Sequence, residues 1–292
     1  MSDSIPSTVG TTPHSSQDIL AHPRFATARA AYVDALLNLY EGNAFLNRLL
    51  IEAGRQVTFN MIVQLHCRHD EADPATWPTM RLLKQELKPF GMSERRIDDL
   101  VSRLVHFDLL ELRQSARDRR VRILTPTPAM MSLDHDWLVA HYLPLHIMFP
   151  EPGYGPVIER DDAFQRSHRV VALGFSGRGM DIMAGNPAMM LFLSRDAGTM
   201  ILVKLVQMAS TTRDAEGLSY ADIGARFGVS RTHVRTLLPD AERNGDVSLS
   251  GRGGKFVELK PSILQAFDRF VADSMSGHDL LFRITRSQMA GG

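Results

Sequence analysis

The sequence predicts a mainly α-helical fold with small β-hairpins, of the α+β class, built from two similar units in one chain. One observation is a repeated order of apolar helix, glycine turn, second helix and hairpin. The other is the spacing of the two copies: Gly91 and Gly228 lie 137 positions apart, and Pro126 and Pro261 lie 135 apart. A period of this length indicates duplication of a whole domain rather than a solenoid of short repeats.

Length and composition agree with two domains. The chain has 292 residues and 44% hydrophobic content, which is enough for two ordinary cores. We expect a disordered tail at 1–20, because its early residues are rich in Ser, Thr and Pro, and a first domain at 21–150. A linker rich in Pro and Gly at 151–160 then leads to a second domain at 161–292. The tail has no apolar stretch, so we do not expect a signal peptide.

Charge and cysteine content limit the expected partners and location. The formal net charge is zero, so contacts with nucleic acid would have to come from local basic patches. A single cysteine permits no intrachain disulfide, and no apolar run reaches the roughly 18 residues of a membrane span. We therefore expect a cytoplasmic protein without a membrane partner.

The sequence also lacks the usual patterns of catalytic and metal sites. It has no phosphate-binding loop, no Gly-x-Ser-x-Gly motif and no Cys-x-x-Cys pair, so we expect neither an enzyme nor a cofactor. One polar cluster lacks metal-ligand spacing and predicts a buried cysteine beside solvated neighbours: His66, Cys67, His69, Asp70 and Asp73. Another group lies among aromatic residues and predicts packing between domains: His135, His141 and His146.

The second unit carries the clearer helix-turn-helix pattern. Ser219 can cap a first helix, Gly228 suits the left-handed turn position, and Ser230 can cap the second helix. The N-terminal part of such a recognition helix enters the major groove of DNA. Pro239 predicts a kink or an early end of this helix. The candidate DNA contacts at its start are Ser230, Arg231, Thr232, His233, Arg235 and Thr236.

The first unit has a weaker recognition helix, at 93–107, followed by a basic hairpin. Acidic residues interleave with its candidate contacts, and carboxylates that face a phosphate backbone weaken binding. The candidates on this helix are Ser93, Arg95, Arg96 and Arg103. The hairpin tips supply the others, which are Arg117, Asp118, Arg119 and Arg120 in the first unit and Arg252 and Lys255 in the second.

The segment 115–125 has an Asp-x-Arg at the hairpin tip and a strand that ends in Leu-Thr, and it resembles the wing of the MarR family of winged helix-turn-helix regulators. The resemblance implies that Arg120 enters the minor groove and that Asp118 orients it. The resemblance to the MarR family covers about 32–137. The second half is similar only as a winged helix, because its hairpin lacks the Asp-x-Arg. The chain is thus similar to a MarR-like dimer fused into one chain. This implies tandem winged helices in a pseudo-dimer, which we expect to pair through helices at 32–40 and 175–183.

Two motifs in the same register with basic hairpin tips favour a sequence-specific transcription regulator that binds double-stranded DNA, as a monomeric pseudo-dimer or a homodimer. The resemblance also implies a small-molecule effector, whose identity the sequence does not give. Two other classes of tandem winged-helix protein stay open: a replication initiator, which would also bind DNA, and an ScpB-like subunit of a chromosome-structure complex. An ScpB-like subunit should carry an acidic, apolar partner surface, whereas the hairpin tips here are basic.

Overall fold

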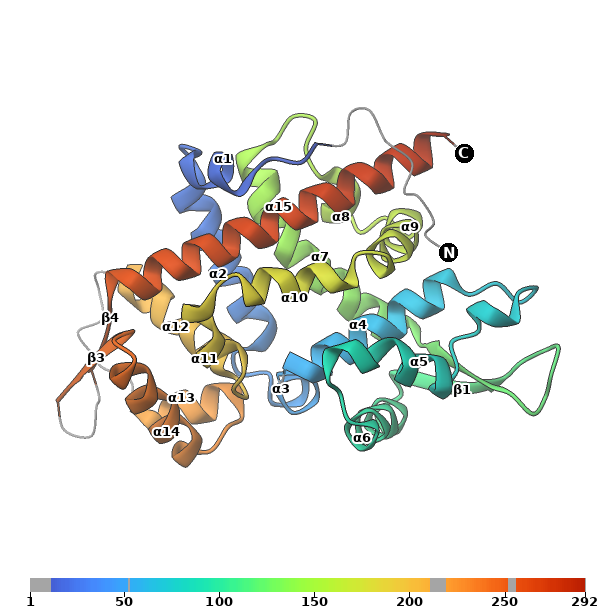
Figure 1. Ribbon diagram of the computed structural model, residues 1–292, viewed down its shortest axis with the longest axis horizontal. Helices are drawn as coiled ribbons and strands as arrows, with labels where there is room; N and C mark the ends of the chain where they lie inside the picture. Colours follow the sequence, from blue (N-terminus) through green and yellow to red (C-terminus); the bar gives the residue numbers. More distant parts are fainter. Residues whose placement is uncertain (1–11, 52, 211–218, 252–255, 292) are drawn as a thin grey trace.

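A computed structural model describes residues 12–51, 53–210, 219–251 and 256–291. These residues form a mainly helical protein with two small antiparallel sheets (Figure 1). The predicted α+β class is therefore confirmed. None of the helices in this part of the chain combines the length and the apolar character needed to cross a bilayer.

The two halves share the order of their later helices and strands. The first half contains α1 (Ser16–Ala21), α2 (Phe25–Tyr40), α3 (Ala44–Leu50), α4 (Ala53–Arg68), η1 (Pro74–Thr76), α5 (Met80–Leu87), η2 (Lys88–Phe90), α6 (Glu94–His106), β1 (Leu110–Gln114), β2 (Arg122–Pro126) and α7 (Pro128–Met148). The second half contains α8 (Gly155–Ile158), α9 (Asp162–Leu173), α10 (Ser176–Ala184), η3 (Pro187–Met189), α11 (Met190–Leu193), α12 (Gly198–Ser210), α13 (Tyr220–Phe227), α14 (Arg231–Arg243), β3 (Val247–Ser250), β4 (Phe256–Leu259) and α15 (Pro261–Gly291). Each half places a two-stranded hairpin after a pair of helices joined by a turn, and each ends in a long helix.

Each hairpin is anchored at its base. β1 pairs with β2 from Leu110 opposite Pro126, and β3 pairs with β4 from Val247 opposite Leu259. These four residues are buried, and the positions nearer the hairpin tip are more exposed in β1, β3 and β4, whereas β2 stays buried as far as Ile123. The tips of the hairpins therefore extend away from the core.

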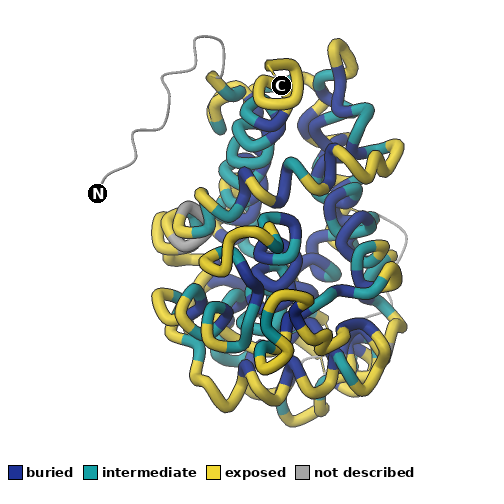
Figure 2. Tube along the Cα trace, turned by 90° about the vertical axis from the view of Figure 1, so that its right-hand side faces the viewer, coloured by how far each residue is buried: buried dark blue, intermediate teal, exposed yellow. Residues whose placement is uncertain are grey.

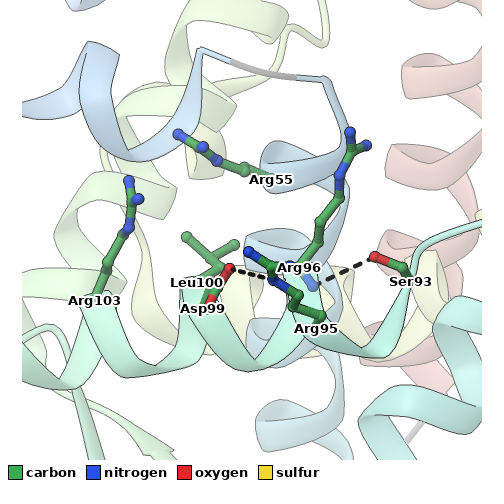
Figure 3. A pocket seen from close by; sticks show the side chains of 7 residues that line it. All are labelled: Arg55, Ser93, Arg95, Arg96, Asp99, Leu100 and Arg103. Carbon is green, nitrogen blue, oxygen red and sulfur yellow. Dashed lines mark hydrogen bonds and ion pairs between the residues drawn. The ribbon is translucent and has the colours of Figure 1, made fainter.

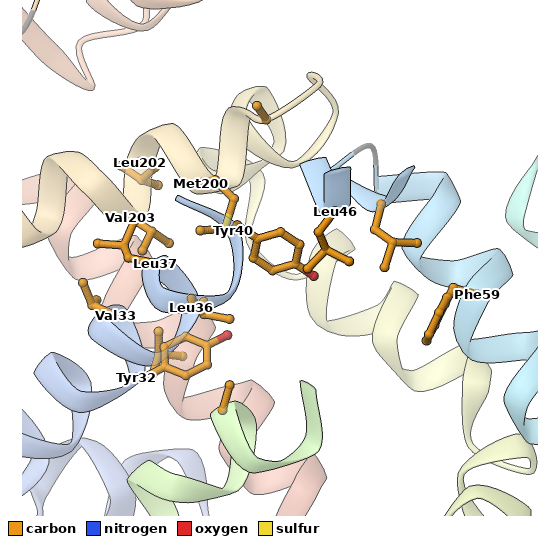
Figure 4. Packing of buried hydrophobic residues seen from close by; sticks show 14 of the residues in the cluster. Tyr32, Val33, Leu36, Leu37, Tyr40, Leu46, Phe59, Met200, Leu202 and Val203 are labelled. Atoms are coloured by element: carbon orange, nitrogen blue, oxygen red, sulfur yellow. The ribbon is translucent and has the colours of Figure 1, made fainter. Parts of the chain in front are cut away.

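The two halves share one hydrophobic core, and their helices pack reciprocally. α2 packs against α7 of its own half and α12 of the other half, while α9 packs against α15 of its own half and α4 of the other. Figure 4 places Leu37 and Tyr40 of α2 beside Met200 and Val203 of α12. α7 and α15 also contact each other, and the buried part of the trace runs through the centre of the molecule (Figure 2). Equivalent faces of the two halves are thus buried against each other.

An ion pair is buried where α7, α9 and α15 meet. Asp134 of α7 and Arg169 of α9 have side chains that are 0% and 3% exposed, and Arg169 Nε lies 2.9 Å from Asp134 Oδ2. Gln165 Nε2 donates a second hydrogen bond to the same carboxylate at 2.7 Å. Because Asp134 belongs to the first half and Arg169 to the second, this pair joins the halves.

Three neutral histidines lie at the same junction. His141 stacks on Trp137 with ring centroids 3.8 Å apart, and its ring centroid lies 5.3 Å from that of His278. His168 Nε2 lies 2.7 Å from the hydroxyl of Tyr142. Burial lowers the pKa of His141 to about 4 and lowers the pKa values of His168 and His278 well below the usual value for histidine. The predicted packing of His141 among aromatic residues is confirmed.

Two segments expected to lack structure are partly ordered. Within the expected tail at 1–20, α1 packs against α15 and buries Ile19 completely, so that prediction is wrong from residue 16 onward. Residues 1–11 lie outside the described residues. The expected linker at 151–160 contains α8 and the buried Tyr154, whose hydroxyl donates to Asp279 Oδ1 at 2.8 Å. Both segments are ordered because α15 supplies a surface on which they pack.

Two other predictions also need correction. Of the two outcomes expected at Pro239, a kink or an early end of the helix, the early end is wrong: α14 continues to Arg243, and Leu238 and Ala241 on either side of the proline are fully buried in the core. The expected pairing of 32–40 with 175–183 is wrong, since α10 packs mainly on α15. The first residue of α2, Phe25, and the first residue of α9, Asp162, lie 137 positions apart, which is also the spacing of the two glycine turns. The counterpart of α2 is therefore α9.

Candidate nucleic-acid interface

The predicted recognition helix of the first unit corresponds to α6, and the start of α6 is defined by local interactions. Gly91 has a φ of 67°, which a residue with a Cβ would adopt only with strain. Ser93 caps the helix, since its Oγ accepts a hydrogen bond from the backbone N of Arg96 at 3.4 Å. The apolar face of α6 is buried, and the predicted arginines at 95, 96 and 103 are all exposed.

These three arginines line a cavity of about 430 Å³ together with Arg55 of α4 (Figure 3). Arg55 was not predicted from the sequence. It reaches this cavity because Gly54 lets α4 approach the turn before α6; a Cβ on Gly54 would lie 2.6 Å from Met92 Sδ. Among the described residues of the lining, one, Asp99, carries a carboxylate. Four guanidinium groups around one cavity favour an anionic group such as a DNA phosphate.

The acidic residues of α6 have cationic partners. Lys84 of α5 lies 3.2 Å from Glu94 Oε2 and 2.9 Å from Asp98 Oδ1, and these hydrogen bonds raise the pKa of Lys84. Asp99 Oδ2 lies 4.0 Å from Arg95 Nε. These ion pairs reduce the repulsion of phosphate expected from the carboxylates. Lys84, which was not predicted from the sequence, neutralises two of them, Glu94 and Asp98.

The tip of the first hairpin contains a preformed contact between Asp118 and Arg120. Asp118 Oδ1 accepts from the backbone N and Nε of Arg120 at 3.0 and 3.1 Å, and Oδ2 accepts from Nη2 at 3.1 Å. These hydrogen bonds lower the pKa of the Asp118 carboxyl and raise that of Arg120. The Arg120 side chain remains 91% exposed. Arg117 and Arg119 beside it are exposed as well.

The second recognition helix, α14, follows the predicted local structure closely. Ser219 and Asp222 form a capping box at the start of α13, Gly228 has a φ of 69°, and Ser230 Oγ accepts from the backbone N of His233 at 3.0 Å. Gly224 is also required, because a Cβ there would lie 2.6 Å from the carbonyl oxygen of Val229. The predictions of both caps and of the left-handed turn are confirmed.

The outward side of α14 carries the predicted contacts. Arg231, Thr232, Arg235 and Thr236 are exposed, and His233 is half-buried. Thr236 Oγ1 donates to the carbonyl of Thr232 at 3.1 Å. Within the described residues, no carboxylate pairs with Arg231 or Arg235, in contrast to Arg95 on α6. Arg252 and Lys255, the candidates on the second hairpin, lie outside the described residues.

Residues of the first half form hydrogen bonds with the C-terminal end of α13. The backbone N of Gly42 and the Nδ2 of Asn47 both donate to the carbonyl oxygen of Arg226, at 3.0 and 3.2 Å. Glu41 forms an ion pair with the guanidinium of Arg226 and accepts a hydrogen bond from Lys204 Nζ of α12 at 3.2 Å. These contacts, which we call the α13 clamp, fix α13 relative to α3.

The two recognition helices occupy the same side of the molecule. In Figure 1, α6 and α14 both lie along the lower edge, and the two hairpins lie toward opposite ends. The helices α6 and α14 thus lie along one edge although they come from different halves of the chain, and the first hairpin extends from one end of the molecule.

The polar cluster near Cys67 has a structural explanation. Cys67 is buried, and burial raises the pKa of its thiol to about 11. Asp70 Oδ1 and Asp73 Oδ1 accept backbone hydrogen bonds from Ala72 and Ala75 at 2.8 and 3.0 Å. In the part of the chain that the structure describes, no three His, Cys, Asp or Glu side chains are grouped so that they could hold a metal ion.

Comparison with known proteins gives no match to this chain, whether among family models, curated proteins or solved structures.

Proposed function

We propose that this chain is a pseudo-dimer of two winged helices that binds specific sequences of double-stranded DNA and regulates transcription. The observation that carries the proposal is the pair of N-capped helices, α6 and α14, which lie along one edge, carry exposed arginines and belong to one reciprocally packed core. Reciprocal burial of equivalent faces is the pattern of a twofold dimer interface. A twofold arrangement of recognition helices fits two DNA half-sites.

The two units would contribute differently to binding. On α14, Arg231 and Arg235 lie near the capped N-terminus without carboxylate partners among the described residues, so they are suited to hydrogen bonds with base edges. On α6, the arginines gather around a cavity with Arg55, which suits contact with the phosphate backbone. Arg120, oriented by Asp118, would enter a narrow minor groove.

The proposal is tested by selecting bound duplexes from a random library with the full chain. We expect an enriched motif, and affinity for it that falls steeply with salt because phosphate contacts release counterions. The double variant Arg231→Gln/Arg235→Gln should lose the motif. Arg286→Gln is the matched control, since Arg286 is an exposed arginine near the end of α15, away from the edge that carries α6 and α14 (Figure 1). Failure to enrich any motif would overturn the proposal.

A map of bound sites across the genome separates a regulator from a replication initiator. A regulator should occupy sites upstream of several genes, because its binding controls their transcription. Occupancy confined to one replication origin would instead support the initiator. Absence of bound sites, together with stable capture of a protein partner, would support the ScpB-like alternative.

A further inference from the structure

The helices α6 and α14 match each other residue by residue. Each contains 13 residues and begins directly after a serine cap, Ser93 or Ser230, and the two caps lie 137 positions apart. With this spacing, every buried residue of α6 is matched by a buried residue of α14. The matched pairs are Ile97 and Val234, Leu100 and Leu237, Val101 and Leu238, and Leu104 and Ala241. The residues outside the buried faces can therefore be compared position by position.

The charges outside the buried faces do not match. At three positions one helix carries a carboxylate and the other a guanidinium, and none of the arginines on α6 is matched by an arginine on α14. The three pairs of opposite charge are Glu94 and Arg231, Asp98 and Arg235, and Arg103 and Asp240. The first two pairs lie in the N-terminal half of each helix, and all four of their residues are exposed. The part of the helix that enters a major groove thus carries opposite charge in the two halves of the chain.

The residue that pairs with the carboxylates of α6 is replaced together with them. Lys84 of α5 lies 3.2 Å from Glu94 Oε2 and 2.9 Å from Asp98 Oδ1. The residue 137 positions after Lys84 is Ala221 of α13, which has no charge that could repel the arginines of α14. The first half therefore has one cation beside two carboxylates, whereas the second half has two arginines and an alanine at the corresponding positions.

These differences determine which bases each helix could contact. An arginine donates two hydrogen bonds to O6 and N7 of guanine, whereas a carboxylate accepts a hydrogen bond from the amino group of cytosine. A DNA site with twofold symmetry presents the same base to both recognition helices. A guanine that accepts from Arg231 in one half would therefore face Glu94 in the other half. Carboxylate oxygens and guanine O6 and N7 are all acceptors, so this second contact would be unfavourable.

From this comparison we infer that the chain binds a directional DNA site, in which the half under α14 differs in sequence from the half under α6. The inference rests on the proposed function, because it concerns the same interface with DNA. Arg231 and Arg235 select guanines in one half, and Glu94 and Asp98 exclude guanines from the equivalent positions of the other. The protein therefore binds in a single orientation, with the first hairpin always at the same end of the site.

The first test is the symmetry of the motif that the full chain selects from a random library of duplexes. We expect a motif with two unlike halves. Two further duplexes each repeat one half of that motif as an inverted repeat at the same spacing. Both symmetric duplexes should bind at least about tenfold more weakly than the selected motif, because each places unsuitable bases under one of the two helices.

The second test gives α6 the residues of α14 at the three positions described above. In the exchange variant Lys84→Ala/Glu94→Arg/Asp98→Arg, one of the symmetric duplexes should bind more tightly than the motif with unlike halves. The matched control is Lys84→Ala/Glu94→Gln/Asp98→Gln, which removes the same charges without adding a guanidinium. The control should prefer neither symmetric duplex to the selected motif.

The outcomes separate this inference from the proposed function. A selected motif with two identical inverted halves would overturn the inference and leave the proposed function in place. The same holds if the unaltered chain binds a symmetric duplex as tightly as the motif, or if the exchange variant still prefers the unlike halves. Failure to select any motif would overturn both.

Discussion

Removing the carboxylate of Asp134 should destabilise the whole protein. In Asp134→Leu, the guanidinium of Arg169 would remain buried without its anionic partner, among neutral histidines. Breaking a buried ion pair by removing one partner costs about 3–5 kcal/mol. Since folded domains are stable by about 5–15 kcal/mol, the loss should be a large fraction of the total.

The assay is urea unfolding followed by circular dichroism and by tryptophan fluorescence. Because the two halves share one core, both signals should report one transition, at a lower urea midpoint in the variant. Asp134→Leu/Arg169→Met should recover most of the stability, since apolar replacement of both partners removes the unpaired charge. The control is Asp273→Asn, which breaks the half-exposed pair with Arg269 and should cost only about 0.3–0.5 kcal/mol. A loss below about 1 kcal/mol in Asp134→Leu, or no recovery in the double variant, would refute the reasoning.

Three further predictions concern pH and DNA binding. The buried histidines at the junction, His141 among them, have pKa values in the folded state below the unfolded value of about 6.5, so the unfolded chain binds more protons. The free energy of unfolding should therefore fall as the pH drops from about 6.5 toward 4. Equal urea midpoints at pH 7 and pH 5 would contradict this prediction. Arg120→Ala should weaken DNA binding about tenfold or more, because a charge-assisted contact is lost, with little change in the urea midpoint, because the side chain is exposed. Unchanged affinity measured by fluorescence anisotropy would show that Arg120 has no role in binding. Arg231→Ala should relax base preference at defined positions of the DNA site. Arg119→Ala should instead lower affinity evenly across DNA sequences and reduce the salt slope by about 1. Site selection with both variants tests this difference, and the opposite pattern would contradict it.

Features set by neighbours in the sequence were predictable. The capping box of Ser219 and Asp222, the left-handed Gly228 and the cap at Ser230 all depend on residues within a few positions of each other. Arg55 could not be found in this way, because its place beside α6 depends on how α4 packs against the turn near Met92.

The errors in the sequence analysis have a common physical cause. Composition at 1–20 and 151–160 indicated a disordered tail and a linker. It could not indicate that α15, far away in the sequence, would offer surface for Ile19 and an acceptor for the hydroxyl of Tyr154. Likewise, an isolated helix would be weakened by Pro239, but burial of Leu238 and Ala241 keeps α14 continuous.

The α13 clamp has a consequence for the length of DNA that the chain could bind. Gly42 and Asn47 both donate hydrogen bonds to the carbonyl of Arg226, so packing, and not a flexible linker, sets the separation of α6 and α14. On duplex DNA with about 10–10.5 base pairs per turn, one inserted base pair rotates one half-site relative to the other by roughly 35°. A chain that binds as proposed would have to break the clamp or twist the DNA to follow that rotation. Its binding sites should therefore share a single spacing between half-sites, even where their base sequences differ.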